Sequence, residues 1–176
     1  MAKIKKIIAR EIMDSRALPT VESIIELDDG SVNSFSVPSG ASVGKHEAVE
    51  LRDRDPKRFE GLGVLNCLKI ISQILSPQLI GQDAYNQEAI DDILIKSDGT
   101  DNKSKLGANT ILALSGAIVK AASISQKMPF YQYISKLYGA NSREFSLPTP
   151  MFNILNGGLH AGGNLDFQEF MIVPSK

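Results

Sequence analysis

The first forty residues alternate between apolar and polar positions in the way that is typical of β-strands. Residues 3–12 are rich in β-branched side chains, and the runs 20–29 and 31–40 follow with a similar pattern. Asp29-Gly30, which separates the second run from the third, is a strong hairpin dipeptide. The pattern therefore predicts a three-stranded antiparallel meander.

Further along the chain the apolar positions take up helical spacing. Residues 63–80 carry apolar side chains three to four positions apart, interrupted by Pro77, and residues 84–96 form a second amphipathic segment. Residues 109–127 are apolar on nearly all sides, which predicts a helix at the centre of a helical layer. A short fourth helix is expected over residues 130–139.

This order of elements divides the chain into three sections. Strands followed by helices indicate an α+β domain over residues 1–140. Residues 141–150 contain two prolines and are interpreted as a linker. Residues 151–176 hold two short apolar runs, MFNIL and FMIV, on either side of a glycine-rich stretch, which predicts a β-hairpin. An isolated hairpin is marginal in water, so this one needs support from the preceding domain or from additional protein.

Composition narrows the class of protein. The formal net charge is −1, from 19 basic and 20 acidic residues, so no strong field indicates nucleic acid or an anionic membrane as a partner. A single cysteine, Cys67, fits a reducing cytosol. The most apolar stretch contains Lys120 and serines, so no transmembrane span is predicted. We expect a cytoplasmic protein.

The segment PSGASVGKHEAVE resembles two known motifs without matching either. A phosphate-binding loop requires G-x-x-x-x-G-K-[ST], but the two glycines here are one residue too close and His46 replaces the hydroxyl residue. A zinc protease requires H-E-x-x-H, and the second histidine is missing. The segment reads either as a surface loop of small residues or as a loop whose hydroxyls, from Ser39 and Ser42, serve a hard cation such as Mg²⁺.

The glycine-rich stretch NGGLHAGGNLDFQEF offers a histidine, an amide and a carboxylate close together: His160, Gln168 and Glu169. These groups suit a polar, anionic or metal-bound substrate, although on chemistry alone a solvated turn with surface acids is the more ordinary explanation. Gln168 and Glu169 are adjacent at the start of a strand, so only one of them faces a given pocket unless a bulge intervenes. A third polar segment, residues 98–109, reads as a loop that leads into the buried helix, with Asn109 or Ser104 as the N-cap.

Taken together and in this order, these segments resemble the enolase family, the phosphopyruvate hydratases of glycolysis. The resemblance is carried by DSRALPTVE (14–22), VPSGASVGKHEAVELRD (37–53), DGTDNKSKLGANTILALS (98–115) and LNGGLHAGGNLDFQEFMIVP (155–174). It implies an N-terminal α+β domain followed by a β/α barrel that holds most of the active site. Because such a barrel takes about 250 residues, we expect residues 151–176 to be only its opening hairpin.

The resemblance also implies the chemistry, which is the reversible dehydration of 2-phosphoglycerate to phosphoenolpyruvate with two Mg²⁺ ions. Ser42 matches the loop serine that binds the second Mg²⁺, and His160 matches the histidine over the substrate. Gln168 and Glu169 match the amide and carboxylate near the substrate hydroxyl and the departing water. The catalytic lysine, the Mg²⁺ carboxylates and the principal acid have no counterpart in these residues.

Two interpretations follow from the resemblance. One is part of a Mg²⁺-dependent enolase that forms a homodimer through its N-terminal domain. The other is a non-catalytic, truncated enolase-like module that acts through binding or dimerisation.

The sequence departs from the family pattern at two places. Ala17-Leu18 replace the usual Gly-Asn, and Val43 replaces a threonine. If the turn needs positive φ, Ala17 costs on the order of 1 kcal/mol. We expect Leu18 to be exposed and Val43 to stiffen its loop.

Overall fold

The fold is given by a computed structural model. It describes residues 1–40, 44–139, 145–158, 161–163 and 165–175. The chain divides into two compact units, Met1–Ala140 and Asn141–Lys176.

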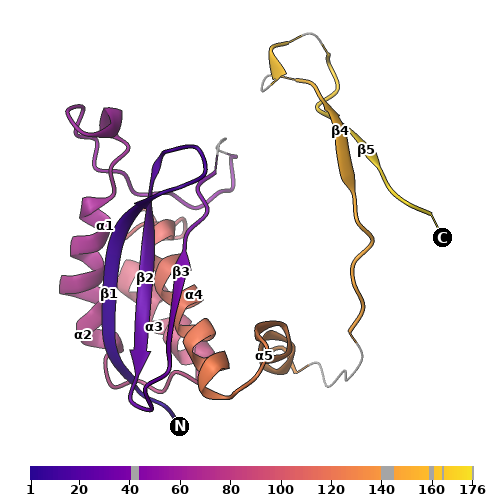
Figure 1. Ribbon diagram of the computed structural model, residues 1–176. Coiled ribbons are helices and arrows are strands. Elements are labelled where there is room, and N and C mark those ends of the chain that lie inside the picture. The colour runs from indigo at the N-terminus through magenta and orange to yellow at the C-terminus, as the bar shows by residue number, and fades with distance from the viewer. Residues whose placement is uncertain (41–43, 140–144, 159–160, 164, 176) are drawn as a thin grey trace. The chain divides into compact units, whose positions relative to one another are not determined.

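The first unit is built on a three-stranded antiparallel sheet, as the sequence predicted (Figure 1). Its strands are β1 (Ile4–Met13), β2 (Pro19–Leu27) and β3 (Val32–Ser36), in the order β1-β2-β3. The turn at Asp29-Gly30 joins β2 to β3, and the Leu27 amide donates to the Ser31 carbonyl at 2.8 Å. The predicted meander and its hairpin are therefore confirmed.

Strand β2 is the centre of the sheet and lines the core. Val21, Ser23, Ile25 and Leu27 alternate along it and are fully buried, because successive side chains of a strand point to opposite faces. The helices that follow cover this face.

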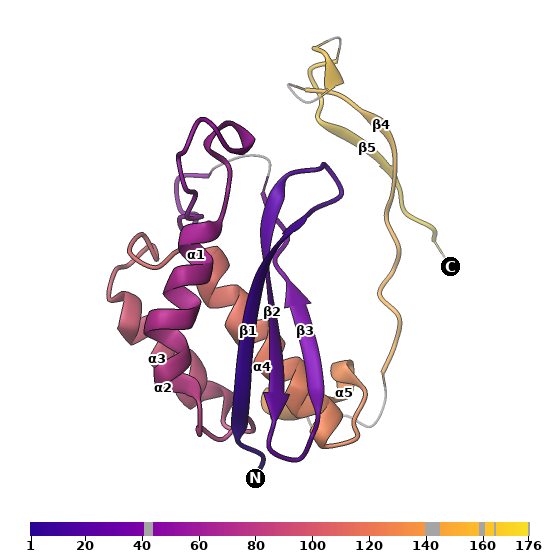
Figure 2. The ribbon, with the colours of Figure 1, turned by 60° about the vertical axis from the view of Figure 1, so that its left-hand side comes forward.

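Seven helical segments follow the sheet, five of them α-helices and two of them short 3-10 or π-helical turns. They are η1 (Phe59–Gly61), α1 (Leu65–Ile70), η2 (Ile71–Leu75), α2 (Ser76–Leu79), α3 (Gln87–Asp98), α4 (Ala108–Ser125) and α5 (Phe130–Leu137). Helix α4 packs across β2 and β3, while α1 and η2 pack beside β1 (Figure 2). The α+β architecture is confirmed.

The predicted interruption at Pro77 takes an unexpected form. The backbone stays helical from α1 through α2, and η2 is a π-helical turn placed just before the proline. Pro77 has no N–H to donate and its ring crowds the preceding turn. A wider π turn at that point lets the helix continue past the proline, so the chain is not broken there.

Helix α4 is the one helix within the described residues that is long and apolar enough to cross a membrane by length and composition. Most of its residues are buried against the sheet and the neighbouring helices. It is therefore the core helix of the first unit, as its all-round apolar pattern predicted.

The second unit contains a two-stranded antiparallel hairpin, β4 (Phe152–Asn156) and β5 (Glu169–Ile172). All residues of both strands are exposed within this chain. The predicted hairpin is present, and its two strands do not bury their apolar side chains against each other.

The turn between β1 and β2 tests the expectations for Ala17 and Leu18. Ala17 has φ +59°, so this turn does require positive φ, and an alanine occupies it. Leu18 is half-buried, and the expectation that it is exposed was wrong. Its amide donates to Asp14 Oδ1 at 2.9 Å, and its carbonyl accepts from the Asp14 amide at 2.8 Å, which folds the residue back onto the turn. Val43 lies outside the described residues.

Candidate active-site regions

The four candidate site residues fall in two parts of the chain. Ser42 and His160 lie outside the described residues. Gln168 and Glu169 belong to the hairpin of the second unit, and the structure brings these two together.

Gln168 and Glu169 line a cavity of about 190 Å³, together with Asn156 and Gly157. Glu169 is the first residue of β5 and pairs with Asn156, whereas Gln168 precedes the strand. Strand alternation therefore does not apply to Gln168. Its carbonyl accepts from the Gly157 amide at 2.8 Å, which closes the end of the hairpin.

This cavity has the right groups for a polar ligand but a small volume. Ligand pockets usually enclose roughly 300–1,000 Å³. The amide of Gln168 can donate and accept, and the Glu169 carboxylate can accept a proton or a hydrogen bond. The arrangement can therefore hold one polar edge of a ligand.

In the first unit, the segments singled out by sequence converge where residues 37–53 leave and rejoin the domain. We call this place the loop neck and define it by Val37, Ser39, Val49, Glu50 and Arg52. On the entering side, the Val37 amide donates to the Val21 carbonyl at 2.9 Å. The Thr20 hydroxyl donates to the Val37 carbonyl at 2.7 Å. On the entering side, Val37 therefore continues the pairing of β3 with β2 by one residue.

The returning side is held by the segment that precedes α4. The Val49 amide donates to the Asn102 carbonyl at 2.8 Å, and the Val49 carbonyl accepts from Ala108 at 2.8 Å. Asn109 makes two further bonds to the Leu51 backbone. The loop over 98–109 thus fixes the returning end of the loop neck.

Asn109 and Ser104 were the two alternatives for the N-cap of the buried helix, and neither serves as one. Gly107 occupies the cap position and no side chain caps the helix. Asn109 lies one residue inside α4, where its amide side chain reaches Leu51. Ser104 instead bonds through its hydroxyl to Thr100. The tertiary contact to Leu51 takes the place of a local cap.

Gly107 is required at this junction. Its φ is +88°, and a Cβ there would lie 2.6 Å from both Asn109 Oδ1 and Leu51 Cβ. Both the conformation and the close approach therefore favour glycine.

Arg52 bridges the two sides of the loop neck and binds it to the rest of the domain. Its Nη1 donates to the carbonyls of Pro19 at 2.6 Å and Leu62 at 2.8 Å. Its Nη2 donates to Ser39 Oγ at 2.7 Å and Glu50 Oε2 at 2.8 Å. One guanidinium therefore joins both ends of the loop to the first residue of β2 and to the segment after η1.

Asp53 and Glu11 order the segment that follows. Asp53 accepts from the amides of Leu65 and Asn66 at 2.8 Å each, at the start of α1. Glu11 forms a two-point ion pair with Arg58 and accepts from the Val64 amide at 2.9 Å. The Arg58 hydrogen bonds hold the pKa of Glu11 below its usual range, against the opposing effect of burial. Both carboxylates serve the structure of this segment.

The phosphate-loop and zinc-protease alternatives find no support in the geometry. Residues 44–58 form turns and extended chain, whereas a phosphate loop opens a helix. Glu50 stands four residues after His46, where a second histidine would be needed, and it pairs with Arg52. No group of three His, Cys, Asp or Glu side chains that could hold a metal occurs among the described residues.

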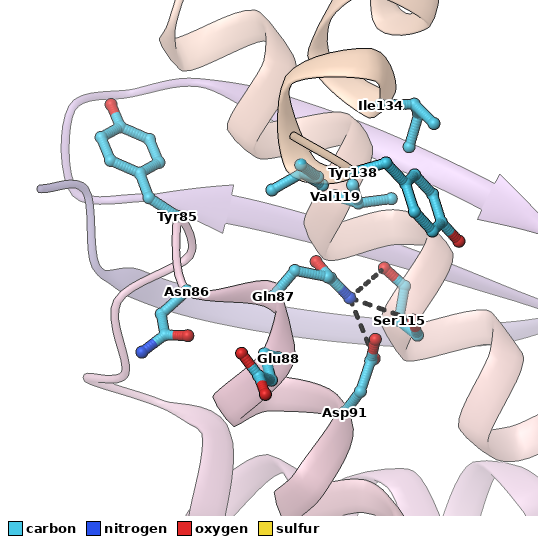
Figure 3. A pocket seen from close by; sticks show the side chains of 10 residues that line it. Tyr85, Asn86, Gln87, Glu88, Asp91, Ser115, Val119, Ile134 and Tyr138 are labelled. Carbon is cyan, nitrogen blue, oxygen red and sulfur yellow. Dashed lines mark hydrogen bonds between the residues drawn. The ribbon is translucent and has the colours of Figure 1, made fainter. Parts of the chain in front are cut away.

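A larger cavity, of about 440 Å³, lies between α3, α4 and α5 (Figure 3). The Gln87 amide crosses its floor and donates to Asp91 Oδ1 at 2.9 Å and Ser115 Oγ at 3.1 Å. Glu88 at the rim favours a cation, whereas the N-terminus of α3 beside it favours an anion. The Gln87 side chain joins α3 to α4, because it donates to Asp91 on its own helix and to Ser115 on α4.

Arg52 was not among the residues singled out from the sequence, and Asn109 was considered only as a helix cap. Both lie within the quoted segments, but nothing in their type or spacing marks them as contacts. Asn109 and Leu51 are 58 residues apart, so their pairing becomes visible only in the folded chain.

The structure thus defines an α+β domain that is followed along the chain by a two-stranded hairpin. The family model "Enolase, N-terminal domain" matches residues 4–134, and "Enolase, C-terminal TIM barrel domain" matches residues 144–176. The chain belongs to the enolase family.

Two relatives show how far the similarity extends. The chain is 53% identical to an enolase of Anaplasma phagocytophilum (strain HZ) over 174 residues, which are 99% of this chain and 39% of the relative. It is 54% identical to an enolase of Ehrlichia canis (strain Jake) over 172 residues, which are 98% of this chain and 40% of the relative. The chain thus spans about two fifths of the length of these relatives.

Proposed function

We propose that this chain supplies the N-terminal part of a cytoplasmic, glycolytic enolase that interconverts 2-phosphoglycerate and phosphoenolpyruvate with Mg²⁺. The observation that carries the proposal is that both family models match, and that relatives named enolase align over nearly the whole chain. The loop neck adds support, because three of the four segments that resemble the family meet there.

Within this proposal each candidate residue has a role. Ser42 contributes its hydroxyl to a Mg²⁺ ion. His160 lies over the substrate and assists catalysis. Gln168 donates or accepts hydrogen bonds at the substrate hydroxyl, and Glu169 receives or returns a proton there.

Binding of Mg²⁺ requires more ligands than the described residues supply. Mg²⁺ prefers an octahedral set of oxygens, with one or two carboxylates among them. The described residues contain no cluster of three potential ligands, and in the hairpin cavity Glu169 is the sole carboxylate. These residues do not fit a complete Mg²⁺ site, so we assign no step of the reaction to a metal held by them.

We further propose that the first unit mediates homodimer formation, as the family resemblance implies. Sedimentation or light scattering of the purified chain measures this, and a monomer at all concentrations contradicts it.

A second function rests on the same lack of a metal cluster in the described part of the chain. It is a non-catalytic module that acts through binding or dimerisation. Turnover measurements distinguish the two functions.

The test follows phosphoenolpyruvate absorbance with 2-phosphoglycerate and Mg²⁺. The chain alone is expected to show no turnover. Turnover is expected when a separate fragment is added that covers the part of an enolase relative beyond the matched region. Glu169→Ala should abolish that turnover, while Glu88→Ala, an exposed glutamate in the first turn of α3, should leave it unchanged. If complementation gives no turnover, the non-catalytic module is favoured.

A further inference from the structure

We propose that Arg52 is a positioning residue, which holds the two ends of the loop over residues 37–53 in a fixed relation. The inference rests on the proposed function only for its consequence in catalysis. The clamp itself consists of Ser39, Glu50 and Arg52, and all three are described residues of the first unit.

The clamp is a closed set of three contacts. Arg52 Nη2 donates to Ser39 Oγ at 2.7 Å and to Glu50 Oε2 at 2.8 Å. The Ser39 hydroxyl in turn donates to the same Glu50 oxygen at 3.1 Å. Each member therefore contacts the other two, and the two loop ends are joined across eleven positions of sequence.

The guanidinium also ties the clamp to the body of the domain. Its other terminal nitrogen, Nη1, donates to the carbonyls of Pro19 and Leu62. The Arg52 side chain is 16% exposed, and its bond to Pro19 is part-buried, whereas its bond to Leu62 is exposed. Bonds of a charged donor are stronger than neutral ones.

Arginine is the side chain that suits this arrangement. Four acceptors lie around two different nitrogens, with carbonyls on one and the hydroxyl and carboxylate on the other. A lysine ammonium is a single point and reaches only one of these sets. Arg52→Lys should therefore retain part of the clamp, and Arg52→Met none of it.

Other contacts set the positions of the individual ends but do not join them. Val37 is held by the sheet. Val49 and Leu51 are held by the loop before α4 and by the first two residues of that helix. Without Arg52 the bonds of each end are no longer supported by a link to the other end, so they open more often. In the Arg52 variant the distance between the two ends of the loop is therefore less fixed, and so is the position of the residues between them.

Hydrogen exchange of the purified chain tests the clamp without any need for turnover. Arg52→Met should speed exchange of the Val37, Val49 and Leu51 amides by about tenfold, and Arg52→Lys by less, since charge-assisted bonds are lost. Amides at the centre of α4 should be unchanged.

Arg58→Met is the matched control. It also removes an arginine from an ion pair, here the two-point pair with Glu11, but it does not touch the loop neck. It should speed exchange at Val64 and leave Val37 and Val49 as they are. If Arg52→Met has no more effect at the loop neck than Arg58→Met, or raises exchange equally everywhere, the clamp is refuted. Should Arg52→Met fail to fold, Ser39→Ala removes one arm alone, and no increase at Val37 then refutes the clamp.

The consequence for catalysis is measured in the complemented assay. Arg52→Met should lower kcat about tenfold more than Arg58→Met, with KM changed much less, because orientation at the transition state is lost. Equal kcat values would overturn the positioning role while leaving the proposed function in place. If the unsubstituted chain gives no turnover with the complementing fragment, the proposed function and this consequence fail together, and exchange alone decides the clamp.

Discussion

Asn109 binds the backbone of Leu51 at two points. Its Oδ1 accepts from the Leu51 amide at 3.0 Å, and its Nδ2 donates to the Leu51 carbonyl at 3.0 Å. A side-chain amide here replaces the partner strand that an extended segment normally needs. Asn109 is buried, so both bonds are shielded from water.

Asn109→Ala is expected to lower the free energy of unfolding by about 2 kcal/mol, because it leaves the half-buried Leu51 amide without a partner and its carbonyl with only the weak Cys67 thiol donor. Urea denaturation measures the change. Ser104→Ala, at the other position predicted as the helix cap, is the control and should cost less than about 0.5 kcal/mol. Equal costs would mean that the contact to Leu51 contributes little.

The strands and helices were predictable from sequence because their cause is local. The alternation in β2 and the all-round apolar pattern of α4 each follow from the burial of one element. The contacts of Arg52 and Asn109 were not predictable, because each joins segments that are far apart in the chain. The π turn before Pro77 was missed for a different reason, since a proline predicts a disturbance of the helix but not the form that it takes.

The candidate site was likewise predicted in part. Gln168 and Glu169 were singled out together, and they do line one cavity. The expectation that a regular strand would separate them did not apply, because β5 begins only at Glu169. Strand ends are set by tertiary contacts and are the least predictable part of an element from its sequence.

Ala17→Gly should raise the free energy of unfolding by about 0.5 kcal/mol, because φ +59° strains an L-residue and glycine relieves it at some cost in chain entropy. Ala89→Gly, at an exposed position in α3, should instead lower it by about 1 kcal/mol. Thermal or urea unfolding of the two variants measures both values. A loss of stability in both would show that the turn gains nothing from glycine.

Gly116 in α4 faces the ring of Phe35 in β3. A Cβ at Gly116 would lie 2.6 Å from Phe35 Cγ. Gly116→Ala should therefore destabilise the fold by about 1–2 kcal/mol, although alanine is the better helix former. The double variant with Phe35→Leu should recover part of this loss in denaturant titrations. No recovery would place the cost elsewhere than at the ring.

Acid should weaken the ion pair between Glu11 and Arg58. The Arg58 hydrogen bonds lower the pKa of Glu11 in the folded chain, so this stabilisation is present above the unfolded pKa of about 4.3 and is lost as the pH falls through the lower folded value. Glu11→Gln should therefore be less stable than the unsubstituted chain at pH 7, and the difference should shrink below pH ~4. Urea midpoints from pH 3 to pH 7, with exposed Glu60→Gln as control, measure it. A difference that stays constant with pH would contradict the assignment.

The hairpin of the second unit should be far less protected than α4. Phe152, Phe170 and Ile172 are exposed, and an isolated two-stranded hairpin is marginal in water. Hydrogen exchange should therefore be faster over 152–156 and 169–172 than over 109–125, and equal protection would show that the hairpin is stabilised by contacts beyond its own two strands.

A pair of substitutions checks the same point: Leu114→Ala in the core should cost about 2–5 kcal/mol, whereas Ile172→Ala should cost less than about 0.5 kcal/mol, because it opens no buried cavity.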